Sequence, residues 1–209
     1  MAGAIAIRTA LLPIIPHESN YYMVAFIAMF YASFSYQALL APHKFRALFL
    51  AALIFQGAGA LAYLVMPALG PFIYETGVTP TQTMAQQGML DVYRDLVAGG
   101  PAWVAENGDA NITAGLAAMP SLHTGGSFLF LLFAWRHARV LMPLYCLLFG
   151  FILVTSIASR WHYLIDLPVG LALAWFSAWS ADRLIAWQDR GAKTTEAAPA
   201  SNPDAPLIT

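Results

Sequence analysis

Residues 158–166 read Ala-Ser-Arg-Trp-His-Tyr-Leu-Ile-Asp, and this stretch opens a long hydrophobic run. Ionisable residues are sparse in the chain, yet here His162 precedes Asp166 by four positions. A second stretch, Met-Pro-Ser-Leu-His-Thr-Gly-Gly-Ser over residues 119–127, opens another hydrophobic run and carries His123. The sequence therefore places two histidines and one carboxylate where apolar segments begin.

The composition around these stretches is that of a membrane-embedded protein. The chain has 209 residues, enough for one domain, and is 59% hydrophobic and only 10% charged, against about 25% charged residues in soluble domains. A net charge of -1 provides no basic surface for nucleic acid, so we expect no nucleic-acid partner. The single cysteine, Cys146, excludes a disulfide framework and a cysteine-based zinc site.

Hydropathy predicts an all-α, polytopic membrane bundle over residues 1–188. A tail poor in apolar residues, 189–209, is predicted to be disordered. Residues 2–16 are predicted to form an interfacial or a short, tilted helix, which makes five to six transmembrane helices in total. The five segments long enough to cross a membrane are 21–40, 47–66, 116–135, 140–158 and 164–187.

One long polar segment, residues 67–115, separates the second of these spans from the third. It is rich in Thr, Gln, Gly and acidic residues, and residues 81–97 are predicted to form a short surface helix within it. It is too short to contain a domain of its own. We expect it to be an extracytoplasmic cap over the membrane face.

The distribution of Lys and Arg orients the spans. The short segments 42–46 and 136–139, together with the C-terminal tail, carry positive charges and fall on one side, which should be cytoplasmic. His123 and His162 then lie at the same depth on the extracytoplasmic side of a multi-pass protein of the cell membrane. The order of the spans alone therefore brings the two histidines to the same face of the membrane.

The spacing of His162 and Asp166 suggests a catalytic pair. Residues four apart on a helix share a face, so a histidine N–H could donate to the carboxylate and leave the other ring nitrogen as a nucleophile. Pro168 is also typical of a first helical turn. If the helix begins there, the two residues straddle its start and the spacing argument is weaker.

The second stretch and Arg160 together contain groups that could bind a phosphate. Backbone N–H groups at the start of a helix following Ser121 would bind an anion, and Arg160 would add a full positive charge. His123 would protonate the leaving oxygen as a general acid. The residues together predict a phosphoryl-transfer site.

These motifs resemble those of the type 2 phosphatidic acid phosphatase superfamily over roughly residues 60–180. The family's Pro-Ser-Gly-His motif reads Pro-Ser-Leu-His at residues 120–123, and its His-x-x-x-Asp motif falls at residues 162–166. The form Met-Pro-Ser-Leu-His with His-Tyr-x-x-Asp is most similar to the inositol phosphotransferase branch, which includes the inositol phosphorylceramide synthases. The resemblance implies a lipid phosphatase or phosphotransferase.

By this resemblance His162 would form a phosphohistidine, Asp166 would orient it, and His123 would act first as acid and then as base. No metal or other cofactor is implied.

The phosphate-binding residues are less clearly matched by the family pattern. The family's Lys-x6-Arg-Pro motif is absent, and Arg160 precedes the second histidine with only one residue between them. Arg160 and Arg94 are therefore the candidate phosphate-binding arginines, with Ser121 and Leu122 at the helix start. Leu122 replaces the family's glycine and adds bulk, although its backbone N–H remains.

The predicted substrate is a lipid phosphate, with water or an alcohol as acceptor, either inositol or a lipid of the diacylglycerol or ceramide type. Hydrolysis and head-group transfer both remain open, because pocket shape selects the acceptor. The competing interpretation is a non-enzymatic or proton-coupled transporter component, which would need ionisable residues deep in several spans. Here the ionisable residues gather at the ends of the spans, which favours an enzyme.

Overall fold

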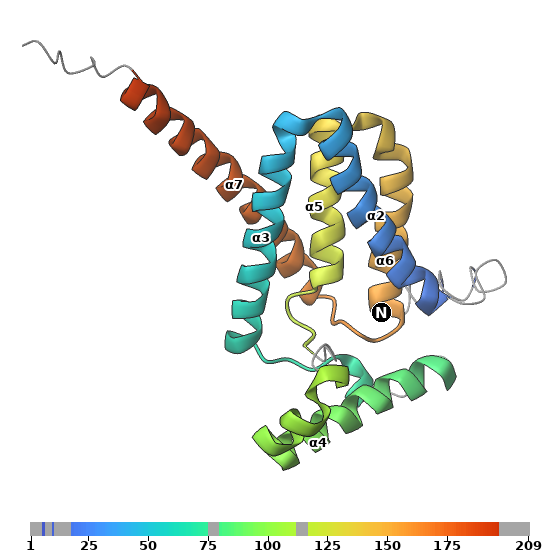
Figure 1. The fold of residues 1–209 in the computed structure, drawn as a ribbon. Helices are drawn as coiled ribbons and strands as arrows, with labels where there is room; N and C mark the ends of the chain where they lie inside the picture. The colour runs from blue at the N-terminus through green and yellow to red at the C-terminus, as the bar shows by residue number, and fades with distance from the viewer. Residues whose placement is uncertain (1–5, 7–9, 11–17, 75–79, 112–116, 197–209) are drawn as a thin grey trace, which may run out of the picture.

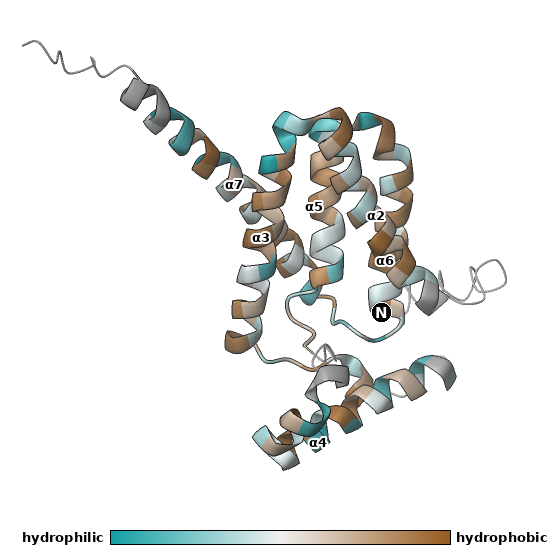
Figure 2. Cartoon of the chain, in the orientation of Figure 1, coloured by the Kyte–Doolittle hydropathy of each residue, from teal (hydrophilic) through white to brown (hydrophobic). Residues whose placement is uncertain are grey.

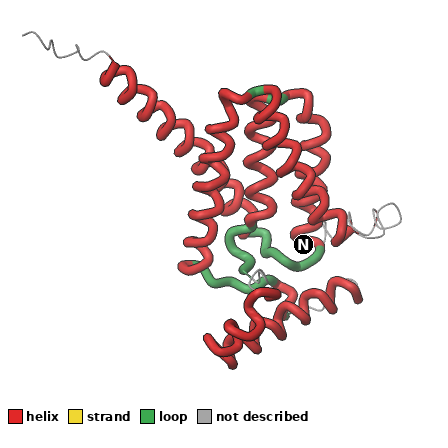
Figure 3. Tube along the Cα trace, in the orientation of Figure 1, coloured by secondary structure: helices red, strands yellow, loops and turns green. Residues whose placement is uncertain are grey.

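The computed structural model describes residues 18–74, 80–111 and 117–196, together with residues 6 and 10. Within these ranges the regular structure is helical, joined by loops, and no strand is present (Figure 3). The prediction of an all-α fold is confirmed for this part of the chain.

Four helices stand side by side and a fifth crosses them (Figure 1). α7 (Asp166–Glu196) packs against α3 and α5 and then continues beyond the bundle. Two short 3-10 turns, η1 (Pro71–Ile73) and η2 (Arg139–Leu141), precede α4 and α6. The four upright helices are α2 (Glu18–Leu40), α3 (Pro42–Val65), α5 (Leu122–His137) and α6 (Met142–Ala158).

Three segments among the described residues are long and apolar enough to cross a membrane: Tyr21–Leu40, Pro42–Val65 and Arg139–Ala158. Hydrophobic residues run along the bundle in Figure 2, and hydrophilic ones gather toward the helix ends. These features indicate a membrane protein. The count of five to six transmembrane helices stays a prediction, because α5 has only 16 residues and α7 becomes polar toward its C-terminal end.

The core lies between the bundle helices and includes Leu48, Phe133 and Ile152, which are almost fully buried. α7 contributes small side chains, which allow helix backbones to approach closely. At Gly125 of α5 an added Cβ would lie 2.6 Å from the carbonyl oxygen of Gly170 in α7. The first turns of α5 and α7 are therefore in direct backbone contact.

α4 (Pro80–Asn111) lies across one end of the bundle (Figure 1). The predicted helix over residues 81–97 corresponds to the part of α4 before a kink at Gly100, and a second helical part continues from there to Asn111. Gly100 adopts φ 56°, a left-handed conformation that glycine tolerates, and Pro101 restarts the helix. The Gly-Gly-Pro sequence over residues 99–101, which is typical of a helix end, here marks a bend.

The two ends of the chain can be compared with their predictions only in part. The predicted N-terminal helix over residues 2–16 falls almost entirely outside the described residues. The predicted tail starts at residue 189, whereas α7 continues to Glu196. Residues 197–209 lie outside the described residues.

Candidate active site

Three loops meet at the end of the bundle that α4 crosses (Figure 3). They follow α3, precede α5 and precede α7. The N–H of Ala118 donates to the Ala68 carbonyl at 2.7 Å, and the N–H of Ser121 donates to the Asp166 carbonyl at 3.2 Å. The first bond joins the loop before α5 to the loop after α3, and the second joins the two motif stretches, although about 40 residues separate them in the sequence.

His162 is buried, and its ring is held by a main-chain group. Its Nδ1 lies 2.7 Å from the carbonyl oxygen of Ala118. A carbonyl oxygen only accepts hydrogen bonds, so Nδ1 carries the proton and Nε2 carries the lone pair. The loop that leads into α5 thus sets the tautomer of His162.

Asp166 lies beside this imidazole without a hydrogen bond to it. The distance from its Oδ2 to Nδ1 of His162 is 3.7 Å, which exceeds hydrogen-bonding distance. α7 begins at Asp166, so the two residues straddle the helix start. The carboxylate is 1% exposed and accepts the N–H of Tyr163 at 2.7 Å. It supplies negative charge beside His162, and the first turn of α7 stabilises that charge.

His123 is the second residue of α5 and lies at the same end of the bundle. Two aromatic rings of α2 contact its ring edge-on: the centroid of Phe26 is 4.9 Å away and that of Tyr22 is 5.4 Å away. His123 is also close enough to His162 for an electrostatic interaction between the two. The structure therefore brings the two predicted histidines and the predicted aspartate into one region.

A chain of buried hydroxyl groups runs from the start of α5 into α6. Ser121 donates to the Thr124 hydroxyl at 3.0 Å, which lies 3.2 Å from the Ser156 hydroxyl. Ser156 donates onward to the Ile152 carbonyl at 2.6 Å, so Thr124 is the donor to Ser156. Both donors of Ser121, its hydroxyl and its N–H, are thereby engaged within the protein. In this arrangement Ser121 positions the loop, and neither donor is available to the predicted phosphate.

The side chain of Leu122 packs against α3. A Cβ added at Gly59 would lie 2.6 Å from Leu122 Cδ2, so the absence of a side chain there makes room for the leucine. The first helical hydrogen bond of α5 runs from Gly125 N–H to the Ser121 carbonyl. The N–H groups of residues 122–124 precede it, in the position where helices bind anions.

The two predicted arginines lie in different places. Arg160 is half-buried in the loop that carries His162 and has φ 63°, a left-handed conformation uncommon for residues other than glycine. Arg94 is exposed on α4 and forms an ion pair with Asp91 of the same helix at 3.2 Å. Arg160 is thus the candidate that lies in the same loop as His162.

Several groups at this site could not be identified from the sequence. The Ala118 carbonyl is a main-chain acceptor, and Thr124 and Ser156 resemble ordinary packing residues of a membrane helix. Tyr22 resembles an interface aromatic residue, and Tyr63, whose hydroxyl donates to the Pro120 carbonyl at 3.2 Å, resembles one as well.

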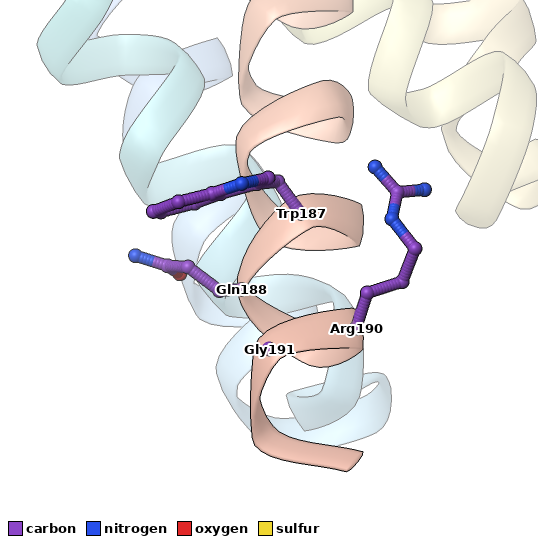
Figure 4. A pocket seen from close by; sticks show the side chains of 4 residues that line it. All are labelled: Trp187, Gln188, Arg190 and Gly191. Carbon is purple, nitrogen blue, oxygen red and sulfur yellow. The ribbon is translucent and has the colours of Figure 1, made fainter. Parts of the chain in front are cut away.

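Across the described ranges, no group of three or more His, Cys, Asp or Glu side chains is placed to hold a metal ion. A pocket in Figure 4 lies on α7 and is lined by Trp187, Gln188, Arg190 and Gly191. It begins 21 residues beyond Asp166 along the helix, roughly 30 Å at 1.5 Å per residue. That pocket belongs to the opposite end of the bundle.

One of three comparisons of the chain with known proteins gives a match. Neither the curated proteins nor the solved structures include a significant match to the chain. A family model described as the PAP2 superfamily matches residues 12–180, which contain both motif stretches and every bundle helix up to the middle of α7. The chain therefore belongs to the PAP2 superfamily.

Proposed function

We propose that this protein is a membrane enzyme that cleaves a lipid phosphoester or phosphoanhydride through a phosphohistidine on His162. Membership of the PAP2 superfamily supports a phosphatase-type function in general. The observation that carries the proposal is the hydrogen bond between His162 Nδ1 and the Ala118 carbonyl. It leaves Nε2 with a lone pair, at the same end of the bundle as His123 and the N-terminus of α5.

In the first step, Nε2 of His162 attacks phosphorus and the bond to the leaving oxygen breaks. His123 gives its proton to that oxygen as general acid. The imidazole of His162 becomes positively charged as the new bond forms. The Asp166 carboxylate, 3.7 Å from Nδ1, and the Ala118 carbonyl stabilise this charge. The N–H groups that begin α5 and the Arg160 guanidinium stabilise the phosphoryl oxygens.

In the second step, neutral His123 takes a proton from the acceptor, whose oxygen attacks phosphorus. The bond to Nε2 breaks and His162 returns to its neutral form. Water as acceptor releases inorganic phosphate, and an alcohol such as inositol or a lipid hydroxyl yields a new phosphorylated product. The same residues serve both outcomes, so the acceptor is identified by product analysis. We place the site at the extracytoplasmic face of the membrane.

The test is phosphate release by the purified protein in detergent with EDTA, across lipid phosphates, diphosphates and phosphoinositides, with and without inositol and a lipid alcohol. His162→Asn keeps an amide donor toward Ala118 and removes the nucleophile, so turnover should fall to the uncatalysed level. The matched control, His137→Ala, replaces the histidine at the opposite end of α5 and should retain activity.

The covalent intermediate gives a second readout. Wild-type protein quenched during turnover should carry an acid-labile, alkali-stable phosphoryl group that is absent from His162→Asn. Turnover by a folded His162→Asn protein would refute the nucleophile. A wild-type protein inactive on every lipid phosphate, diphosphate and phosphoinositide would refute the proposed lipid substrate and turn attention to the transporter interpretation.

A further inference from the structure

One face of α4 is directed at the end of the bundle. Gln82, Gln86 and Leu90 follow one another at four-residue intervals and are buried. Gln86 donates through Nε2 to the carbonyl of Ser159, in the loop that carries the nucleophile, at 2.8 Å. Leu90 packs with Phe72 in a small apolar cluster. This face of the first half of α4 is therefore turned toward the bundle.

The same face continues beyond its covered part as Tyr93 and Val97, which we call the apolar extension. At 3.6 residues per turn, Tyr93 and Val97 project within roughly 20° of the direction of Gln86. Yet Tyr93 is 43% exposed and Val97 65% exposed, so the described residues leave this part of the face more open than they leave Gln86. Asp95 projects roughly 180° from Gln86, on the opposite side of the helix.

We propose that the apolar extension rests on the lipid surface of the membrane that surrounds the bundle. α4 lies across the end of the bundle (Figure 1), and the covered part of its apolar face looks toward that end. The extension is continuous with that contact and looks in the same direction. For a bundle embedded in a membrane, the surface that flanks its end is lipid, and amphipathic helices bury their apolar face in such a surface.

The charges of α4 identify the kind of lipid surface. Residues 91–109 contain Asp91, Asp95, Glu106 and Asp109 against a single arginine, Arg94. An acidic helix gains nothing from anionic headgroups, so apolar contact supplies the attraction. The proposal therefore specifies a zwitterionic or neutral surface, and contact that does not weaken with salt.

Position-specific fluorescence tests the proposal on the full-length protein. In a Cys146→Ala background, Val97→Cys on the extension and Asp95→Cys on the opposite face are each labelled with an environment-sensitive dye. Both proteins are reconstituted into phosphatidylcholine vesicles, with iodide on both sides or with a quencher attached to lipid near its headgroup. Retained lipid phosphate turnover, or an unchanged elution profile for an inactive preparation, shows that each labelled protein is folded.

We expect iodide to quench the Val97 label severalfold less than the Asp95 label, and the lipid-borne quencher to show the reverse order at low and high salt. Equal quenching of the two labels by iodide would overturn the proposal. A Val97 label shielded from iodide and also untouched by the lipid-borne quencher would overturn it as well, and would assign the extension to a protein contact such as a second copy of the chain. None of these outcomes depends on the proposed chemistry.

Discussion

His162 is oriented by a main-chain carbonyl, and this separates two tasks that one carboxylate could otherwise perform. The Ala118 carbonyl fixes the tautomer, and Asp166 supplies charge. Asp166→Asn keeps an oxygen that accepts the Tyr163 N–H and removes only the charge. We expect turnover to fall by about 10²–10³-fold, the usual loss of one electrostatic contribution, while a phosphoenzyme still accumulates. Product formation measures the turnover, and labelling quenched with alkali measures the phosphoenzyme.

A larger substitution at the same position separates charge from structure. Asp166→Ala also removes the acceptor for Tyr163 N–H at the start of α7, and should cost about 1 kcal/mol of stability in addition. If Asp166→Asn is as inactive as His162→Asn and forms no phosphoenzyme, then the carboxylate and not the Ala118 carbonyl fixes the tautomer.

A second prediction at the residue scale concerns the chain of buried hydroxyl groups. Thr124→Val keeps the shape of the side chain and leaves the Ser121 hydroxyl without its acceptor. Leaving a buried polar group unsatisfied costs about 1–3 kcal/mol, so the thermal unfolding midpoint in detergent should fall clearly. Ser127→Ala is the control, because Ser127 donates only to carbonyls of its own helix. An equal, small shift for both variants would show that the chain of hydroxyl groups does not stabilise the protein.

At this scale the sequence predicts side chains and misses main-chain partners. His123, His162 and Asp166 could be found because ionisable residues are costly in apolar surroundings and therefore rare. The Ala118 carbonyl could not be found, since every residue has one and only the folded loop selects it. For the same reason the sequence suggested that His162 donates a hydrogen bond to Asp166. In the structure His162 Nδ1 lies 3.7 Å from Asp166 Oδ2 instead.

At the scale of elements, the contact between α5 and α7 depends on glycine. A Cβ at Gly170 would collide with the Ser121 carbonyl, whereas a Cβ at Gly57 on α3 meets nothing within 4 Å. Gly170→Ala should therefore destabilise the protein by about 1–3 kcal/mol through overpacking and lower the turnover rate, because Ser121 adjoins the site. Gly57→Ala should be neutral or slightly stabilising. Thermal unfolding and turnover of the two variants are measured in parallel. Equal unfolding midpoints and equal turnover rates for Gly170→Ala and Gly57→Ala would contradict this prediction.

Hydropathy located the bundle helices well and their ends less well. The predicted segment 140–158 agrees with α6 within two residues, because its apolar run is continuous. The predicted segment 116–135 starts six residues before α5, since residues 117–121 are apolar enough to resemble a helix but form a loop bound to Ala68. In α4 the predicted segment 81–97 stops close to the break at Gly100, and the helical part beyond that break was not predicted.

At the scale of the whole molecule, the site and the α5–α6 turn lie at opposite ends of the bundle (Figure 1). The positive charges at the turn predict that it is cytoplasmic and that α4 is extracytoplasmic. In a Cys146→Ala background, a membrane-impermeant maleimide should label Asp95→Cys in intact cells and Val140→Cys only after lysis. Labelling of Val140→Cys in intact cells would reverse the orientation and move the site to the cytoplasm.

The hydrogen bond from the Ser121 N–H to the Asp166 carbonyl has a consequence for variation among related chains. The same residue presents its carboxylate to His162 and its carbonyl to the loop before α5, so the two motifs are aligned by direct contact. The peptide that links α5 to α6, at residues 138–141, plays no part in that alignment. Insertions there lengthen the sequence between His123 and His162 and leave the contact between the two motifs in place, so length differences can accumulate in that turn while the loops at the site keep their length.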